Sequence, residues 1–350
     1  MSLESIVPNL RRLTPDWKNP HLTTYLRYFD SEFYRTHGHI QGKPDLEHLT
    51  RVEAVTHFVV QGWRERRAYS RFLHAFCEPE FYRLAHPELQ LETDGAAVRH
   101  WMYQGFLEGR DPNRTTMRLR KAPYHVFNMA KCGSRSVVEA ITRADPQAAV
   151  IHAHSSIDFA LTYPDCFWSY PEVVARNPNR MRFVAGVRDP FSRLLAGYLQ
   201  EHEAAIAAGT LTCGPASLPG LVHSLTTALP YVVAWFDHGF HCGIDVYSSP
   251  FDTARGYSVY GSGGRQAFVY RMERLSQLEE PLGEFLELPI QLGRHNVTVE
   301  KCRAMADFAA EAKRSVRLPA EVVAETLATR FVRQFFTPAE IEALRDRWSA

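Results

Sequence analysis

The sequence has no long apolar run, no excess of charge of one sign and no regular cysteine pattern. No segment approaches the roughly 18 consecutive apolar residues of a membrane span, and Met1 to Trp17 is not typical of a signal peptide. Forty basic and 39 acidic residues leave a formal net charge of +1, which argues against nucleic acid as a partner. The six cysteines have no CxxC spacing, so neither zinc nor disulfides are indicated. These absences predict a cytoplasmic protein without a transmembrane segment.

An internal repeat occupies the first 113 residues. Tyr28–Tyr34 recurs as Phe76–Tyr82, and His57–Arg67 recurs as His100–Arg110. The period of about 45 residues is in the range of small stacked modules. With 350 residues in total, the chain is long enough for a second, larger domain.

Helical spacing of apolar residues leads up to Gly62 and to Gly105, which predicts that both glycines are helix C-caps. We therefore expect a small helical domain over residues 1–113, with the two thin units packed on each other or on the larger domain. Residues 111–116 are predicted to be a linker. The repeats resemble short modules found beside glycan-modifying enzymes in bacteria. That resemblance implies placement or partner binding, including association with glycan-assembly enzymes.

Residues 122–350 alternate between predicted strands and helices, which indicates a three-layer α/β domain with a parallel sheet covered on both faces. The expected strands are Tyr124–Met129, Ala149–His152, Met181–Val187, Ile244–Tyr247 and Gln266–Tyr270. The expected helices are Ser134–Ile141, Pro190–Ala208, a segment from Pro219 to Phe236, and most of the tail after Val299.

The segment Phe127–Val137 reads as a strand, a tight loop and a helix, which is how a nucleotide phosphate is commonly held. Unpaired amides at a helix N-terminus attract an anion, and a lysine, a glycine and hydroxyls lie beside them. The lysine precedes the glycine by two residues, so the segment is not a Walker A loop. A solvated strand-to-helix turn is the alternative. The candidate donor-binding residues are Lys131, Cys132, Gly133, Ser134, Arg135 and Ser136.

A second strand, turn and helix runs from Phe183 to Tyr198. Arg188 is a candidate for a charge-assisted fork to a phosphate, with an ion pair to Asp189 as the alternative. Ser192 and Arg193 are further candidates, one turn into the helix.

Two histidines, His152 and His154, lie at the end of a predicted strand, on one face of it. The carboxyl ends of parallel strands are where α/β sheets build their sites, and an imidazole there can act as a general base. Metal binding or a polar core pair are the alternatives. No further cluster with metal-ligand spacing is evident, so no metal is expected. The carboxylates Glu139, Glu201 and Glu203 are weaker candidates for the base.

The two phosphate segments resemble the 5′-phosphosulfate and 3′-phosphate motifs of sulfotransferases. Those enzymes use the activated sulfate donor PAPS (3′-phosphoadenosine 5′-phosphosulfate) and release PAP, its 3′,5′-bisphosphate. The segment Ala130–Ser136 departs from the common motif by an alanine in place of proline, and Ala196 stands where a serine is common. The HxH pair resembles the base region of glycan 2-O-sulfotransferases. Phe268–Leu275 resembles the sulfotransferase segment that closes the donor half of the sheet. Gly243–Asp252, Asn296–Lys301 and the tail Phe335–Trp348 resemble bacterial capsular-polysaccharide synthesis proteins.

The resemblance implies a P-loop-like sulfotransferase fold and transfer of a sulfuryl group to a hydroxyl of a glycan or glycolipid acceptor. Lys131 would stabilise charge on the leaving phosphate, and His154 or His152 would take the acceptor proton. Two alternatives stay open. One is a phosphoryl transferase with a similar loop, although the Walker lysine and the metal-binding aspartate pattern are missing. The other is a non-catalytic glycan-assembly scaffold with a degenerate donor fold.

Overall fold

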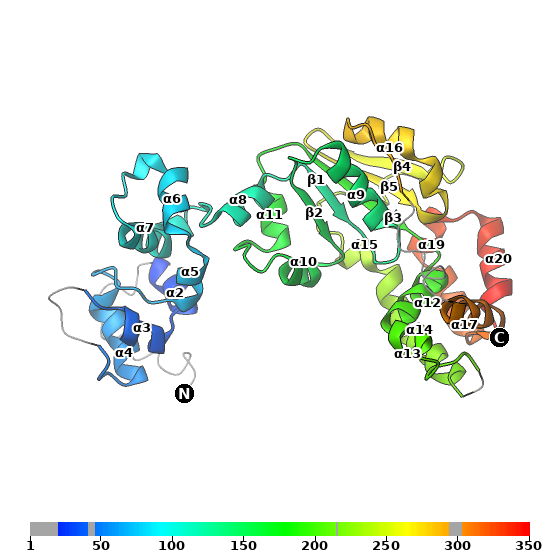
Figure 1. Ribbon diagram of the computed structural model, residues 1–350, viewed down its shortest axis with the longest axis horizontal. Helices are drawn as coiled ribbons and strands as arrows, with labels where there is room; N and C mark the ends of the chain where they lie inside the picture. The colour runs from blue at the N-terminus through cyan, green and yellow to red at the C-terminus, as the bar shows by residue number, and fades with distance from the viewer. Residues whose placement is uncertain (1–19, 41–45, 215, 294–302) are drawn as a thin grey trace. The chain divides into compact units, whose positions relative to one another are not determined.

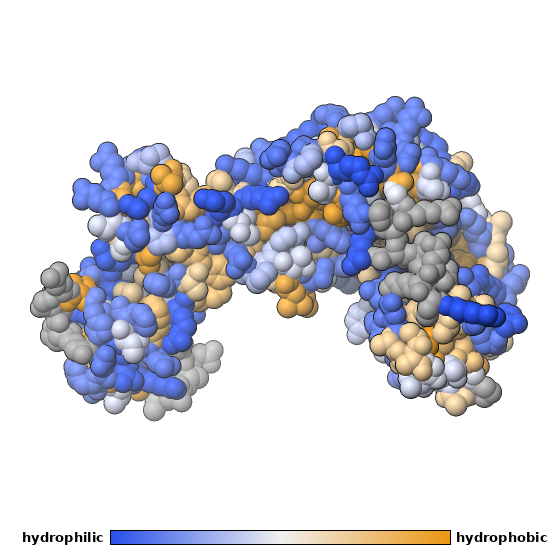
Figure 2. Space-filling view, viewed as in Figure 1, coloured by the Kyte–Doolittle hydropathy of each residue, from blue (hydrophilic) through white to orange (hydrophobic). Residues whose placement is uncertain are grey.

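The computed structural model describes residues 20–40, 46–214, 216–293 and 303–350. The chain divides into two compact units. Unit 1 comprises Met1–Arg118 and the short segment Asp165–Phe167, and unit 2 comprises Leu119–Pro164 and Trp168–Ala350. In both units hydrophilic residues cover most of the face seen in Figure 2. None of the helices in the described ranges is long and apolar enough to cross a membrane.

The regular elements of unit 1 in the described ranges are all helices, joined by turns and irregular segments (Figure 1). Two helices, α4 and α7, run directly into π-helical turns, labelled η2 and η4. The elements are α2 (Pro20–Arg27), α3 (Ser31–His37), α4 (Arg51–His57), η2 (Phe58–Gly62), α5 (Arg71–Phe76), α6 (Pro79–Ala85), η3 (Pro87–Leu89), α7 (Asp94–His100), η4 (Trp101–Gly105) and α8 (Arg114–Arg120), which begins in unit 1.

The repeat is visible in the contacts of each half. The hydroxyl of Tyr34 hydrogen bonds with Nδ1 of His57 at 2.7 Å, and in the second half Tyr82 bonds with His100 at 3.0 Å. Both tyrosine hydroxyls lie against a glycine of the π-helical turn. A Cβ atom added to Gly62 would lie 2.0 Å from the Tyr34 oxygen. The glycine is therefore required by close packing and not by a left-handed backbone.

The prediction that Gly62 and Gly105 are C-caps is accordingly wrong. The left-handed positions come four residues later, at Arg66 (φ 52°) and Gly109 (φ 72°), which are equivalent in the repeat. Both glycines are buried in their π-helical turns, and the chain continues through a further turn, over 63–66 and 106–109, before the left-handed residue.

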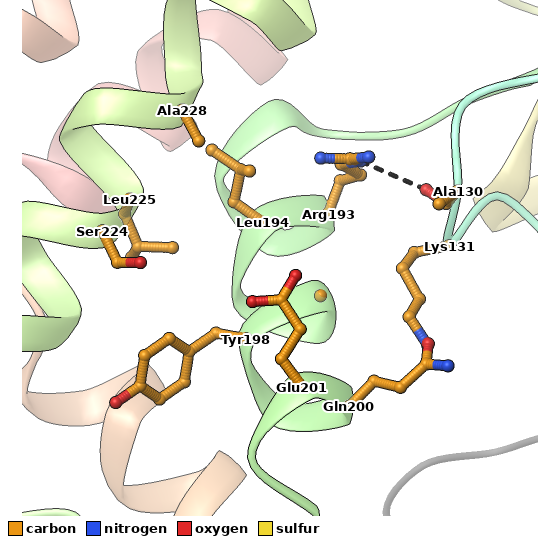
Figure 3. Close-up of a pocket in the computed structure, with 11 residues that line it drawn as sticks. Ala130, Lys131, Arg193, Leu194, Tyr198, Gln200, Glu201, Ser224, Leu225 and Ala228 are labelled. Atoms are coloured by element: carbon orange, nitrogen blue, oxygen red, sulfur yellow. Dashed lines mark hydrogen bonds between the residues drawn. The ribbon is translucent and has the colours of Figure 1, made fainter. Parts of the chain in front are cut away.

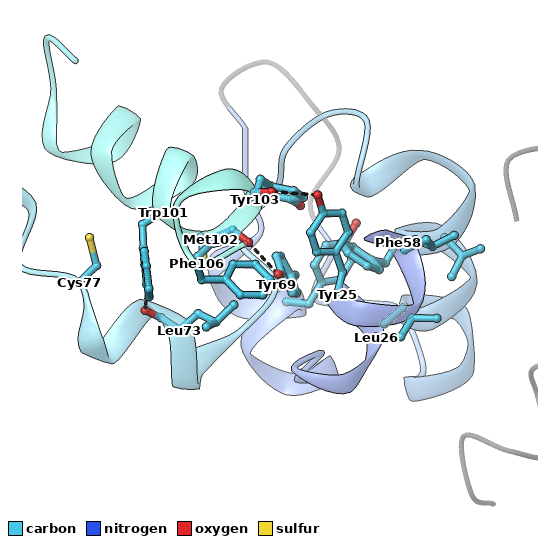
Figure 4. Packing of buried hydrophobic residues seen from close by; sticks show 14 of the residues in the cluster. Tyr25, Leu26, Phe58, Tyr69, Leu73, Cys77, Trp101, Met102, Tyr103 and Phe106 are labelled. Carbon is cyan, nitrogen blue, oxygen red and sulfur yellow. Dashed lines mark hydrogen bonds between the residues drawn. The ribbon is translucent and has the colours of Figure 1, made fainter. Parts of the chain in front are cut away.

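A single hydrophobic core joins the two repeats. Tyr25 and Tyr69 from the first repeat pack against Tyr103 of the second, in a cluster that also contains Trp101 (Figure 4). The aromatic hydroxyls and the indole N–H are bonded to backbone carbonyls: Tyr69 donates to Met102 at 2.8 Å, and Trp101 donates to Leu73 at 2.9 Å. Burial of these large rings is therefore achieved without unpaired polar atoms.

Residues 111–116 were expected to be a linker, and the structure corrects this. Asn113 is buried, its side chain accepts from Thr116 N at 2.7 Å, and α8 begins at the next residue. The same amide donates to the carbonyls of Phe76 and Asp165, each at 2.9 Å. Polar residues that read as a linker are thus the N-cap and buried anchor of a helix.

Unit 2 is a mixed α/β unit with a five-stranded, mostly parallel central sheet (Figure 1). The strands lie in the order β2-β1-β3-β5-β4, and β4 is antiparallel to β5. They are β1 (Tyr124–Phe127), β2 (Val150–Ala153), β3 (Met181–Val187), β4 (Tyr257–Ser262) and β5 (Arg265–Arg271).

Helices pack on both faces of the sheet. The face that contains Val126, Val184 and Phe268 packs against α9 and α16. On the opposite face, Phe127 stacks on Tyr170 of α11 at a centroid distance of 4.0 Å. All seven residues of β3 are buried, as expected for the central strand of a sheet covered on both faces.

The helices of unit 2 include the expected helix after the loop and a helical tail. They are α9 (Ser134–Ala144), α10 (Ser156–Thr162), α11 (Tyr170–Arg176), α12 (Pro190–Glu201), α13 (Glu203–Ala207), α14 (Leu218–Val233), α15 (Trp235–His238), η5 (Met272–Gln277), α16 (Glu279–Leu286), α17 (Arg303–Ser315), α18 (Ala320–Leu327), α19 (Arg330–Phe335) and α20 (Pro338–Trp348). The segment Asn296–Lys301 lies outside the described residues.

The expected strand at Ile244–Tyr247 is a turn. The side chain of Asp245 accepts a hydrogen bond from Tyr247 N at 2.8 Å, and Ser248 donates to the Asp245 carbonyl at 2.7 Å. Gly243 before it has a left-handed φ of 74°. Local bonds from aspartate and serine thus replace the strand that the apolar alternation indicated.

Candidate functional site

The loop between β1 and α9 contains two left-handed residues, Lys131 (φ 70°) and Gly133 (φ 83°). A Cβ atom on Gly133 would lie 2.5 Å from Leu275 Cδ2 and 2.9 Å from Met272 Sδ. Backbone conformation and packing therefore both require glycine at this position. Lys131 tolerates its conformation only because the surrounding contacts hold the loop.

Three consecutive carbonyls of this loop, at residues 130–132, accept hydrogen bonds from side chains. The donors are Arg193 Nε at 3.1 Å, Arg188 at 3.3 Å and the Tyr270 hydroxyl at 2.6 Å. In a trans peptide the N–H points away from the C=O. Each amide of residues 131–133 therefore points away from the donor that is bonded to the carbonyl of the same peptide. These three carbonyls are occupied, so the amides are the backbone groups that the loop can offer to an anion.

The loop also lies tightly against β3. A Cβ atom on Gly186 would lie 2.6 Å from the Cys132 oxygen and 2.9 Å from the Tyr270 ring. The Cys132 side chain is fully buried, and burial raises the pKa of its thiol to about 12. Of the predicted donor-binding residues, Cys132 thus offers its backbone and not its sulfur to a ligand.

The N-terminus of α9 has no side-chain cap. Its N-cap residue is Gly133, whereas α12 is capped by Asp189, whose carboxylate accepts from the amides of Phe191 and Ser192 at 3.0 and 3.2 Å. Because the first amides of a helix carry partial positive charge, the uncapped α9 favours an anion at this end. Ser134 and Ser136 of its first turn are nearly buried, and Arg135 is exposed.

The alternative expectation of an Arg188–Asp189 ion pair is not what the structure contains in the described ranges: the arginine donates to the loop and the carboxylate caps α12. Burial raises the pKa of Asp189, although the two amides that it accepts act in the opposite direction. At the end of β3, Arg188 therefore holds the loop and Asp189 caps α12.

A cavity of about 390 Å³ opens beside the loop. Lys131 from the loop and Arg193, Gln200 and Glu201 from α12 line it, together with residues of α14 such as Ser224 (Figure 3). The cavity brings cations from the two predicted phosphate segments together. Glu201, a weaker candidate in the sequence, also borders it, whereas Glu139 and Glu203 do not.

A second cavity, of about 470 Å³, contains Arg188 and Ser192. Arg271 and Arg347 add positive charge to this cavity, while Glu273 and Glu340 both form ion pairs with Arg271, at 3.2 and 3.0 Å. The structure therefore separates the neighbouring arginines 188 and 193, which line different cavities.

His152 and His154 lie together at the end of β2, with ring centroids 5.0 Å apart. Nδ1 of His154 is 2.8 Å from the Asn128 carbonyl. Because a carbonyl only accepts, Nδ1 carries the hydrogen, and Nε2 of a neutral ring is the unprotonated nitrogen. Asp158 and Trp235 bond the backbone of the same residue, at 2.8 and 3.1 Å.

The environment of His152 is different. Burial first, and then the neighbouring His154, lower its pKa to about 4. Its Nε2 atom is buried and has no hydrogen-bond partner in the described part of the chain. A weakly basic, buried imidazole is a poorer proton acceptor than an oriented one at neutral pH.

Sequence reasoning missed the residues that hold the loop from a distance. Tyr270 and Gly186 belong to strands, and nothing local indicates their contacts with residue 132. A glycine inside a strand is, however, a signal of close backbone approach, and Gly186 in the apolar run of β3 carried that signal. Ser224 on α14 had no signal, since its position beside Lys131 depends on how two helices pack.

No group of three histidine, cysteine, aspartate or glutamate side chains among the residues described is arranged to hold a metal ion. Comparison with known proteins adds no assignment, because no family model, no curated protein and no solved structure matches this chain.

Proposed function

We propose that this protein is a PAPS-dependent sulfotransferase that transfers a sulfuryl group to a hydroxyl of a glycan or glycolipid. One observation carries the proposal: side chains of Arg193, Arg188 and Tyr270 hold three successive loop carbonyls, which fixes the loop directly before the uncapped N-terminus of α9. Preorganised donors of this kind stabilise an oxyanion without reorganisation during the reaction. On this proposal, the sheet of unit 2 is a P-loop-like sulfotransferase fold.

Two cavities on the two sides of the arginine pair support a donor with two separate phosphate groups. The 5′-phosphosulfate would lie at the loop, where Lys131 and Arg193 line one cavity. The 3′-phosphate would lie in the other cavity with Arg188 and Ser192. Ser192 would then supply the hydroxyl that the sequence lacks at Ala196, where sulfotransferases commonly have a serine.

The chemistry is an in-line displacement at sulfur. The acceptor oxygen forms a bond to sulfur while the bond from sulfur to the 5′-phosphate oxygen breaks, and PAP leaves with the electron pair. Lys131 and the loop amides would stabilise the charge on that oxygen. The acceptor proton would pass to Nε2 of His154, because its Nδ1–H is held by the Asn128 carbonyl.

Calorimetric titration with PAP, ADP and AMP tests the donor assignment. We expect micromolar binding of PAP, at least tenfold weaker binding of ADP and AMP, and a loss of that preference in Arg188→Ala. Arg180→Ala is the matched control, because this arginine precedes β3 at its opposite end and is half-exposed. It should bind PAP as the wild type does.

Three results would contradict the proposal in different ways. Equal binding of ADP and PAP would favour a phosphoryl transferase, and absence of binding would favour a scaffold without a donor site. If PAP binds but no glycan or glycolipid acceptor is sulfated, the protein is a scaffold that binds the donor without catalysis. A partnership with glycan-assembly enzymes through unit 1 and a cytoplasmic location, where the free cysteines would stay reduced, belong to the same proposal.

A further inference from the structure

Unit 1 contains a cavity of about 430 Å³ that lies between its two repeats. Its polar lining is largely basic, with Arg66 and His74 from the first repeat and Arg99 from the second. His37, His39, Arg67 and a single carboxylate, Asp94, also line the cavity, together with apolar residues such as Val98 and Met102. A concave site of this volume with a few convergent polar groups has the dimensions of a small-ligand site.

The acidic groups around this cavity are already neutralised by arginines. Asp94 forms an ion pair with Arg83 at 3.1 Å, and Glu65, which precedes Arg66, pairs with the buried Arg67 at 2.6 Å. In contrast, the guanidinium groups of Arg66 and Arg99 have no hydrogen bond or ion pair with any residue in the described ranges. Among the described residues, the rim thus has two guanidinium groups without an acidic partner, in a chain whose net charge is only +1.

Arg66 occupies a position that is unfavourable for arginine. Its φ is 52°, and the equivalent residue of the second repeat, Gly109, has a φ of 72°. Glycine is the residue that adopts this conformation without strain. An arginine at the cavity, where the twin repeat has glycine, indicates that its charge has a use that offsets the strain.

The neighbouring imidazoles are held in place by an aromatic ring. His37 stacks on Phe33 at a centroid distance of 4.4 Å and an interplanar angle of 4°, and His74 lies 5.3 Å from the same ring. Arg99 is placed by its own helix: a Cβ atom on Gly95, one turn earlier, would lie 3.2 Å from its guanidinium. Donors thus surround the cavity from three helices, α3, α5 and α7, in addition to Arg66.

We propose that this cavity binds a tetrahedral oxyanion, the sulfate or phosphate ester of a saccharide. Donors that converge from several elements suit a tetrahedral group better than a planar carboxylate, which one guanidinium fork can satisfy. The saccharide part of this proposal rests on the proposed function, whereas the oxyanion part does not. In a sulfotransferase the site would hold an already sulfated or phosphorylated glycan at unit 1 while unit 2 acts on it, which raises effective concentration.

The test is calorimetric titration of the full chain with glucose 6-sulfate, glucose 6-phosphate, glucuronate and glucose. We expect both esters to bind, with at least tenfold weaker binding in Arg66→Gly and in Arg99→Gln. Arg66→Gly is the decisive variant, because the residue introduced is the one that the second repeat already has and the fold is therefore retained. Arg51→Gln is the matched control, an exposed arginine of unit 1 that does not line the cavity.

The relative affinity of the two esters identifies the source, a sulfated product or a phosphorylated precursor. The proposal is overturned if neither ester binds, if glucuronate or glucose binds equally well, or if Arg66→Gly and Arg99→Gln bind as the wild type does. It is also overturned if the binding is lost in Arg188→Ala, since the ester then occupies the donor site of unit 2. If ester binding depends on Arg66 and PAP does not bind, the oxyanion site in unit 1 is supported and the proposed sulfotransferase function is wrong.

Discussion

The contact of the phosphate loop with β3 can be tested by Gly186→Ala. The added Cβ would lie 2.6 Å from the Cys132 oxygen and 2.8 Å from its Cβ atom, both below any normal contact distance. Because the loop backbone and Tyr270 surround this point, neither side can move freely. Overpacking of a tight core costs about 1–3 kcal/mol, and for a unit of this size each kcal/mol lowers Tm by about 2–4 °C. The displaced loop should also bind PAP at least tenfold more weakly.

Differential scanning calorimetry and PAP titration measure the two effects, and Gly220→Ala is the matched control. Gly220 lies in α14 with no atom within 4 Å of its added Cβ and does not line either cavity, so alanine there should not lower helix stability. If Gly186→Ala melts and binds PAP as the wild type does, the loop does not lie against β3, and the account of its preorganisation is wrong.

Three further predictions concern both units. His154→Ala should lower kcat by about 100-fold or more and His152→Ala much less in a sulfotransferase assay; equal effects would refute the choice of base. Burial lowers the pKa of His125 in the folded protein to about 4, whereas the unfolded chain has the ordinary value of about 6.5. The free energy of unfolding should therefore fall by about 3 kcal/mol as the pH drops from about 6.5 to 4. Urea unfolding should show a flatter pH dependence in His125→Gln, and an unchanged slope would contradict the assignment. Gly62→Ala should destabilise unit 1 by about 1–3 kcal/mol, because of the Tyr34 hydroxyl; an unchanged thermal melt would refute the packing reason for this glycine.

The parallel strands could be predicted from the sequence because each is a short apolar run between clear breaks. Met181–Val187 was predicted with the bounds that the structure has. The antiparallel strand β4 was missed, although two glycines, Gly263 and Gly264, separate it from β5. Two residues of this type between strand-like runs are a hairpin signal. The strand was overlooked because its outer residues are polar or exposed, as expected for an edge strand.

For the candidate site, the sequence predicts the residues whose neighbours along the chain determine their place. Lys131 and Gly133 lie in one loop, and the two histidines lie at the end of one strand, so their proximity follows from local structure. Contacts between distant segments could not be predicted. The donation from Tyr270 to the Cys132 carbonyl joins residues 138 positions apart, and it depends on the strand order, which places β5 beside β3.

Two arginines of the site form hydrogen bonds within the protein when no ligand is bound, and these bonds affect how the site would bind an anion. In the structure, Arg188 and Arg193 each donate to a loop carbonyl. A carbonyl is a neutral acceptor, whereas a phosphate group adds an opposite charge and can accept two parallel bonds from a guanidinium. The nitrogens left over by each carbonyl bond can therefore serve the anion while the loop stays in place. Since an arginine has five donors in a rigid fork, one side chain can hold the loop with one nitrogen and offer the other nitrogens to the ligand in a fixed geometry.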